Sequence, residues 1–195
     1  MPDISSGQTP SSIGASTGSG PAPAAAPTPA PSVIVPVPNG LNQILATFGD
    51  LRPFIQDDGT LSTNWEIEQM TRSVLPFGIP LSGNPGAIVT KIECHHLLSA
   101  VFLQVFNKIA EAGLQSKITS YGGCYAGRAK RTSTHWSAHA WGIAIDLNVA
   151  TNQQGTKGDM DPGVIEVFRS FGFKWGGEFS GASIDPMHFQ YCTGY

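Results

Sequence analysis

The chain has 195 residues, a net charge of -3 and only 13% charged side chains. Its sequence contains neither the basic patch of a nucleic-acid-binding protein nor an apolar run long enough to span a bilayer. Length and composition therefore argue against these two classes, and they favour one globular domain with an appended segment.

Residues 1–32 form that segment, and they are almost entirely Pro, Ala, Ser, Gly and Thr. Such a composition cannot bury enough apolar surface to offset the entropy lost on ordering. We therefore expect a disordered tether over residues 1–32 and a folded domain over residues 33–195. The tether lacks the basic and apolar regions of a signal peptide, so we expect synthesis in the cytoplasm without one.

The odd number of cysteines bears on the same question. Cys94, Cys124 and Cys192 cannot all pair within one chain. Together with the expected lack of a signal peptide, this favours free thiols in a reducing compartment. The alternative is one disulfide with one free cysteine.

Apolar residues at helical spacing predict helices over residues 41–48 and 93–112, and a third helix that begins with Asp161 as N-cap and Pro162 in the first helical position. A capping-box pattern over residues 63–66 predicts a short fourth helix. Strands are predicted over residues 73–75, 118–121, 143–148, 173–175 and 187–191. Without regular alternation of the two types, these elements predict an α+β fold with a small antiparallel sheet and flanking helices.

The segment SAHAWGIAID, from Ser137 to Asp146, carries the clearest chemistry. His139 and Asp146 lie seven positions apart, and the alternating run after Gly142 places Asp146 on the strand face opposite the apolar side chains. A carboxylate in the middle of an apolar strand is costly unless it has a partner. We therefore expect a polar partner beside this strand.

A second alternating segment, Met187 to Tyr191, places His188 and Gln190 on one face of a strand. If the two strands are neighbours, His139, Asp146 and His188 converge on one point. Two imidazoles and a carboxylate with an open fourth position form the ligand set of a catalytic zinc. The sequence thus predicts a Zn²⁺ site built by these three side chains.

Asp185 lies three residues before His188 and is the candidate for a catalytic base. A zinc peptidase needs a carboxylate beside its water, in addition to three protein ligands. The alternative is that Asp185 is only a turn residue at the start of the strand.

Two motifs together, SxHxxGxAxD from Ser137 to Asp146 and DPMHFQ from Asp185 to Gln190, resemble peptidase family M15. This family contains zinc D-Ala-D-Ala carboxypeptidases and L-alanyl-D-glutamate endopeptidases, among them many phage endolysins. Residues 123–131 and 173–177 also resemble segments of the family. The chain differs from many relatives in having aspartate rather than glutamate at the position of the base.

The resemblance implies the zinc DD-peptidase (hedgehog-like) fold, with Zn²⁺ held by His139, Asp146 and His188. It implies that Asp185 activates the water. It also implies that Arg128 polarises the scissile carbonyl or holds a substrate carboxylate, tasks that suit a planar guanidinium.

Four further residues are candidates for substrate contacts. Arg131 is the reserve for Arg128, and for both arginines the alternative is a surface position. Ser137 is expected to contact substrate or orient a ligand through its hydroxyl, whereas a nucleophilic role is not expected, because no acid and base surround it. Tyr125 and Trp175 are the aromatic candidates, and for the tryptophan a core position is the alternative.

The function implied by the resemblance is hydrolysis of an amide bond in peptidoglycan stem peptides, by L-Ala-D-Glu endopeptidase or D-Ala-D-Ala carboxypeptidase action. The expected lack of a signal peptide and the tether favour a phage-type lysin that acts on the cell wall. The alternative is a non-catalytic, metal-stabilised module that binds the wall. Asp185 argues against that alternative, because a structural metal site needs no base.

Overall fold

The computed structural model of the chain describes residues 35–128 and 135–195. The predicted tether lies outside the described residues, so its disorder and the boundary at residue 33 stay predictions. The α-helices are α1 (Leu41–Phe48), α2 (Thr63–Gln69), α3 (Ser99–Glu111) and α4 (Pro162–Ser170). The strands are β1 (Met70–Leu81), β2 (Asn84–His95), β3 (Tyr121–Gly123), β4 (Ala144–Leu147), β5 (Lys174–Trp175) and β6 (His188–Gln190). None of these helices is long and apolar enough to cross a membrane.

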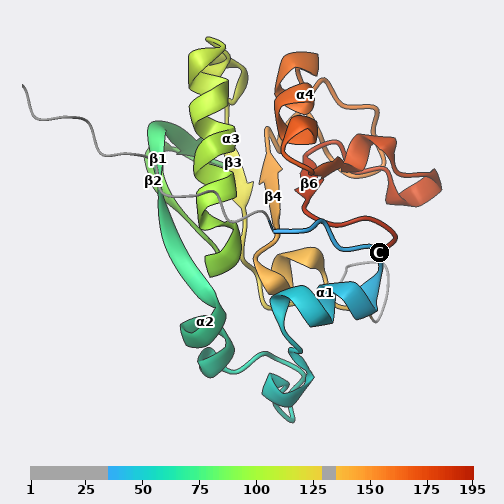
Figure 1. Cartoon of the computed structure of the whole chain (residues 1–195). Coiled ribbons are helices and arrows are strands. Elements are labelled where there is room, and N and C mark those ends of the chain that lie inside the picture. Colours follow the sequence, from blue (N-terminus) through green and yellow to red (C-terminus); the bar gives the residue numbers. More distant parts are fainter. Residues whose placement is uncertain (1–34, 129–134) are drawn as a thin grey trace, which may run out of the picture. The chain divides into compact units, whose positions relative to one another are not determined.

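Within the described residues, the six strands form one sheet in the order β2-β1-β3-β4-β6-β5. Neighbouring strands are antiparallel except for β1 and β3, which are parallel. The predicted α+β class is confirmed, but the sheet is mixed rather than purely antiparallel. In Figure 1 the long β1–β2 hairpin occupies one side of the sheet, and β4 and β6 lie beyond β3.

Three of the predicted helices are confirmed with little change. The helix α1 has the expected bounds, and α2 begins at Thr63 but is preceded by Ser62 as its N-cap. At α4 the side chain of Asp161 accepts a hydrogen bond of 2.8 Å from the backbone N–H of Gly163, as an N-cap does. The local capping signal in the sequence is therefore realised at α4, whereas neither α1 nor α2 has a side-chain cap.

The remaining predicted helix, over residues 93–112, was placed too early. Residues 93–95 belong to β2, where Glu93 pairs with Arg72 and Cys94 pairs with Thr71 of β1, and α3 begins only at Ser99. Pairing with β1, the other strand of this hairpin, overrides the local helical pattern at this point. The predicted strand at 73–75 is likewise only part of β1, which tolerates Pro76 beside an irregularity in the register between Val74 and Ile79.

The strand predicted over residues 118–121 also lies elsewhere. Ile118 follows a short 3-10 helix (Gln115–Lys117), and β3 runs from Tyr121 to Gly123 against β4. A Cβ atom on Gly122 would lie 2.9 Å from the Cβ of Asp146 and 2.5 Å from a methyl carbon of Val149. Glycine is therefore required there, because it lets β3 pass closely beside Asp146.

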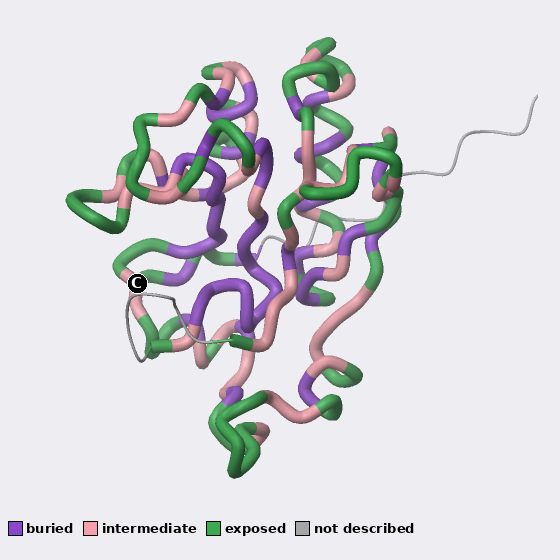
Figure 2. The backbone as a smooth tube through the Cα atoms, turned by 180° about the vertical axis from the view of Figure 1, so that it is seen from behind, coloured by how far each residue is buried: buried purple, intermediate pink, exposed green. Residues whose placement is uncertain are grey.

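Aromatic side chains join the two larger helices to one face of the sheet. The helices α3 and α4 stand beside each other (Figure 1). Phe168 of α4 stacks on Phe189 of β6 with ring centroids 4.2 Å apart, and it also contacts Phe106 of α3. All three rings are fully buried, and the strands β4 and β6 are buried along most of their length (Figure 2). Since Phe189 faces the helices, His188 and Gln190 face the other side of the sheet.

Candidate active site

His139 is placed by a short 3-10 helix, Ala138–Trp141, that precedes β4. Its N-cap is Ser137, whose hydroxyl oxygen accepts a hydrogen bond of 3.3 Å from the backbone N–H of His139. The helix ends at Gly142, which has a φ of 63° and a left-handed conformation. A Cβ atom there would lie 2.6 Å from the sulfur of Met70 and 2.7 Å from the backbone nitrogen of His95. Only glycine therefore turns the chain from His139 into β4 without strain.

Strand pairing brings the other two polar residues together. In the antiparallel register of β4 and β6, Asp146 lies directly opposite His188. The Oδ1 atom of Asp146 is 3.0 Å from Nδ1 of His188 and 3.2 Å from Nε2 of His139. These two ring nitrogens are 3.2 Å from each other, and both histidines are buried. The structure thus brings together the three residues that the sequence predicts as metal ligands.

The outer nitrogens of the two histidines point to acceptors. Nδ1 of His139 is 2.7 Å from the backbone oxygen of Cys124, and Nε2 of His188 is 3.0 Å from the side-chain oxygen of Gln190. Each outer nitrogen therefore carries the proton, and each inner nitrogen of a neutral ring presents a lone pair. Two lone pairs and a carboxylate oxygen then converge within 4.8 Å. Such an all-acceptor set fits a divalent cation, and its mixture of imidazole and carboxylate suits zinc.

The pKa values reflect the same crowding of acceptors. Burial works to raise the pKa of Asp146, but His139 and His188 hold it well below its usual range. Burial works to lower the pKa of His188, but the neighbouring Asp146, with Gln190 and Asp185, raises it overall. In the metal-free protein a proton on His188 is therefore stabilised at the point where a cation fits.

A cleft of about 560 Å³ opens over this cluster. Its walls include Asp185, Arg128 and Ser137, along with the three clustered residues. The backbone N–H of Asp185 donates to the oxygen of Gly176 over 2.9 Å, and its backbone oxygen accepts from the N–H of His188 over 3.0 Å. These bonds hold Asp185 beside His188.

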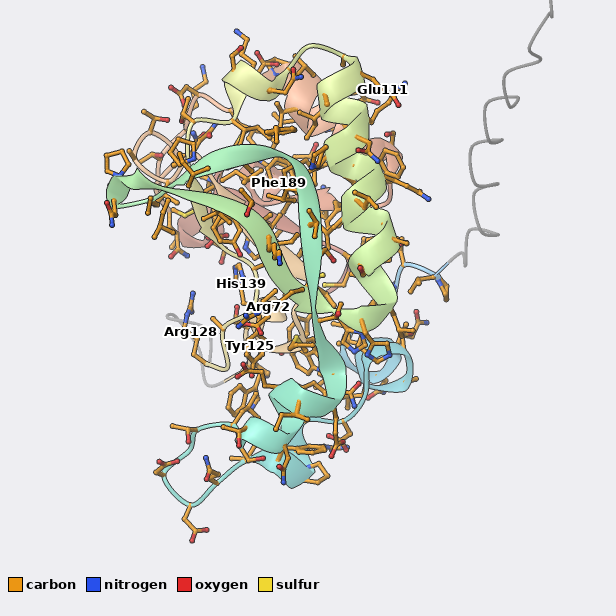
Figure 3. The ribbon with its side chains drawn as sticks, turned by 90° about the vertical axis from the view of Figure 1, so that its left-hand side faces the viewer. Arg72, Glu111, Tyr125, Arg128, His139 and Phe189 are labelled. Carbon is orange, nitrogen blue, oxygen red and sulfur yellow. The ribbon has the colours of Figure 1, made fainter. Side chains whose placement is uncertain are left out.

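Arg128 is an exposed residue of the cleft wall. Its side chain is exposed and extends away from the ribbon on the side where His139 lies (Figure 3). The backbone oxygen of Arg128 accepts a hydrogen bond of 3.1 Å from the N–H of Ser137, which ties it to the segment that carries His139. An arginine so placed can reach a substrate bound over the cluster.

Two of the other expected substrate contacts, Trp175 and Tyr125, do not line this cleft as far as the described residues show. The indole N–H of Trp175 donates to the backbone oxygen of Pro186 over 2.7 Å, so this side chain supports the turn after Asp185. Tyr125 is half-buried and packs against the hydrophobic core, and burial raises its pKa to about 12. Arg131 lies outside the described residues.

Several residues of the cleft were missed by reasoning from the sequence. Gln190 contacts His188, and its place two residues along the same predicted strand was the available signal. Glu178 lines the cleft and pairs with Arg169 at 2.6 Å and with Lys174.

Tyr195 also lines the cleft and was missed. Its hydroxyl donates to the backbone oxygen of Trp136 over 2.6 Å. No sequence pattern signals this contact, which joins segments 59 positions apart.

Comparison with known families matches the part of the chain that carries this cluster. The sequence model of a peptidase family described as D-alanyl-D-alanine carboxypeptidase matches residues 130–191. A comparison with curated proteins finds no match. The family match includes the complete cluster and Asp185, so the resemblance seen in the motifs is confirmed. Over residues 130–191, about a third of the chain, the sequence is therefore similar to peptidase family M15.

Proposed function

We propose that the protein is a zinc peptidase that hydrolyses an amide bond in the stem peptide of bacterial peptidoglycan. The observation that carries the proposal is that the acceptor atoms of His139, Asp146 and His188 converge at a cleft. The wall of the same cleft also contains a further carboxylate, that of the half-buried Asp185. A purely structural metal site needs neither an adjoining cleft nor a further carboxylate in its wall.

Each residue of the cleft has a role in the proposal. His139, Asp146 and His188 would hold Zn²⁺, which when bound would lower the pKa of water toward neutrality and polarise a carbonyl group. Asp185 takes the proton of the attacking water and passes it to the leaving amine. Arg128 donates hydrogen bonds to the oxygen of the scissile carbonyl or to a substrate carboxylate.

Ser137 has a different role in the proposal. Its oxygen already accepts the N–H of His139, so the side chain shapes the turn that carries this ligand. The pair of histidines is engaged with Asp146, with Cys124 and with Gln190 rather than with the serine hydroxyl. A nucleophilic serine is therefore not part of the mechanism.

The lining of the cleft supports a polar peptide as the substrate. The volume of the cleft, about 560 Å³, lies in the range of pockets that bind small ligands, so it can hold a short peptide segment. Hydroxyl and amide groups line the cleft, and they belong to Ser82, Gln154, Ser180 and Ser183. Stem peptides are rich in amide and carboxylate groups, which such a lining can bind. A phage-type lysin that reaches the cell wall is the biological setting that we propose.

Purified peptidoglycan tests this function directly. Incubation with the zinc-loaded protein should release free amines, and mass spectrometry of the products should show whether the L-Ala-D-Glu or the D-Ala-D-Ala bond is cut. The Asp185→Asn protein is the control, because it keeps the shape of the cleft and loses the basic oxygen. Binding of zinc and of the wall without new amines would overturn the peptidase and support a wall-binding module instead.

A further inference from the structure

Gln190 connects His188 to the main chain that follows β6. It lies two residues after His188, so both side chains project from the same face of the strand. Its Oε1 atom is 3.0 Å from Nε2 of His188, and its amide nitrogen is 3.3 Å from the backbone oxygen of Cys192. Gln190 is 4% exposed and Cys192 is fully buried, so water does not compete for these bonds.

The bond to Cys192 decides which way the amide of Gln190 is turned. A backbone carbonyl oxygen only accepts hydrogen bonds, so the NH₂ group of the amide must face it. The amide oxygen of Gln190 must then face the imidazole of His188. Because that oxygen is also only an acceptor, Nε2 of His188 must carry a proton, and in the neutral ring the lone pair is on Nδ1. That nitrogen points to Asp146 and His139.

His139 reaches the opposite tautomer by a different means. Its Nδ1 atom donates to the backbone oxygen of Cys124, which leaves the lone pair on Nε2. The main chain therefore fixes one histidine of the cluster, whereas a side chain fixes the other. A substitution can remove only the second of these two restraints.

We propose that Gln190 is the positioning residue that holds His188 in the tautomer that binds metal through Nδ1. The inference rests on the metal site of the proposed function, but it concerns the metal-binding step and not turnover. Acceptors behind a metal-binding histidine commonly contribute 10–100-fold in metal affinity. We expect Gln190 to contribute a factor in that range.

The test measures zinc affinity by competition with a chelator, so it does not depend on activity. Gln190→Leu removes the acceptor and should weaken zinc binding by about 10–100-fold. Gln190→Glu keeps an oxygen acceptor and should bind zinc at least tenfold more tightly than Gln190→Leu. Gln154→Leu is the matched control, since Gln154 lines the same cleft and makes no described hydrogen bond to the cluster. It should bind zinc as the parent does.

Nuclear magnetic resonance of protein with ¹⁵N-labelled histidine provides the second measurement. In the zinc-loaded parent, His188 should show a protonated Nε2 and a metal-bound Nδ1, and His139 should show the reverse. In Gln190→Leu the Nε2 proton of His188 should exchange faster with solvent. If Gln190→Leu is unfolded by circular dichroism, Gln190→Met, which is closer in length, replaces it in both measurements.

Two results would overturn the inference. One is zinc affinity of the folded Gln190→Leu or Gln190→Met protein within threefold of the parent, with unchanged exchange of the Nε2 proton. The other is an equal loss of affinity in Gln190→Glu and Gln190→Leu, which would mean that the shape of glutamine matters and not its acceptor. A parent protein that binds no zinc would refute the proposed function itself, and it is recognised before any variant is compared.

Discussion

Substitution of Gly142 by alanine adds a single methyl group, and we expect it to lower the stability of the fold and to displace the turn that carries His139. The φ of Gly142, 63°, places an L-residue in the left-handed region, which costs roughly 1–2 kcal/mol. The added Cβ of Gly142→Ala would also lie 2.6 Å from the sulfur of Met70 and 2.7 Å from the backbone nitrogen of His95. Crowding of this kind costs about 1–3 kcal/mol. A more restricted unfolded chain offsets about 0.5 kcal/mol.

The sum is a loss of about 1.5–4.5 kcal/mol in the free energy of unfolding. For a chain of this size each kcal/mol corresponds to about 2–4 °C in the unfolding midpoint, so we expect a drop of about 3–18 °C. Differential scanning calorimetry of the metal-free protein measures it. Zinc affinity should fall as well, because Gly142 joins the turn that carries His139 to β4.

Gly155→Ala is the matched control for this experiment. Gly155 also has a positive φ, 81°, but a Cβ atom there would meet nothing within 4 Å. It should therefore show only the backbone cost of roughly 1–2 kcal/mol and unchanged zinc binding. Equal midpoints for Gly142→Ala and Gly155→Ala would refute the argument from crowding, and unchanged zinc affinity in Gly142→Ala would show that the turn does not position His139.

Three further predictions concern the proposed mechanism and the pH dependence. Replacement of His188 by alanine should lower the zinc content, measured by atomic absorption, well below one ion per chain. Full zinc occupancy in this variant would show that His188 is not a ligand. The Asp185→Asn protein should retain zinc, and its turnover of peptidoglycan should fall by about 10²–10⁴-fold. If this variant keeps full zinc and most of the parent's activity, Asp185 is only a turn residue. His95 is buried and bonded to the backbone oxygen of Phe48, and burial lowers its pKa to about 4. The unfolded chain, with a histidine pKa near 6.5, therefore binds more protons below that value. The contribution of neutral His95 to the free energy of unfolding should therefore be fully present above pH 6.5. It should fall by about 2 kcal/mol between pH 7 and pH 5. Denaturant titration should show this fall reduced in His95→Gln, and an identical slope in both proteins would exclude His95 as its source.

The amino-acid sequence by itself determined the elements that depend on local chemistry. The helices α1 and α4 begin and end where apolar spacing, a capping aspartate and glycine require. Alternation along the segments around Asp146 and His188 placed each polar side chain on the face away from the core. Both strands needed only to be neighbours for the cluster to form, and the register of β4 and β6 makes them so.

Only the tertiary structure decided the parts that depend on distant partners. The start of α3 moved to Ser99, because β1 pairs with the residues before it. Tyr125 and Trp175 pack or bond away from the cleft, although both lie in motif segments. The tautomer of His188 depends on an amide that a main-chain carbonyl turns toward it. Residue type and spacing indicate which hydrogen bonds a side chain is able to make. The direction of each bond depends on which donor or acceptor the fold places opposite that side chain.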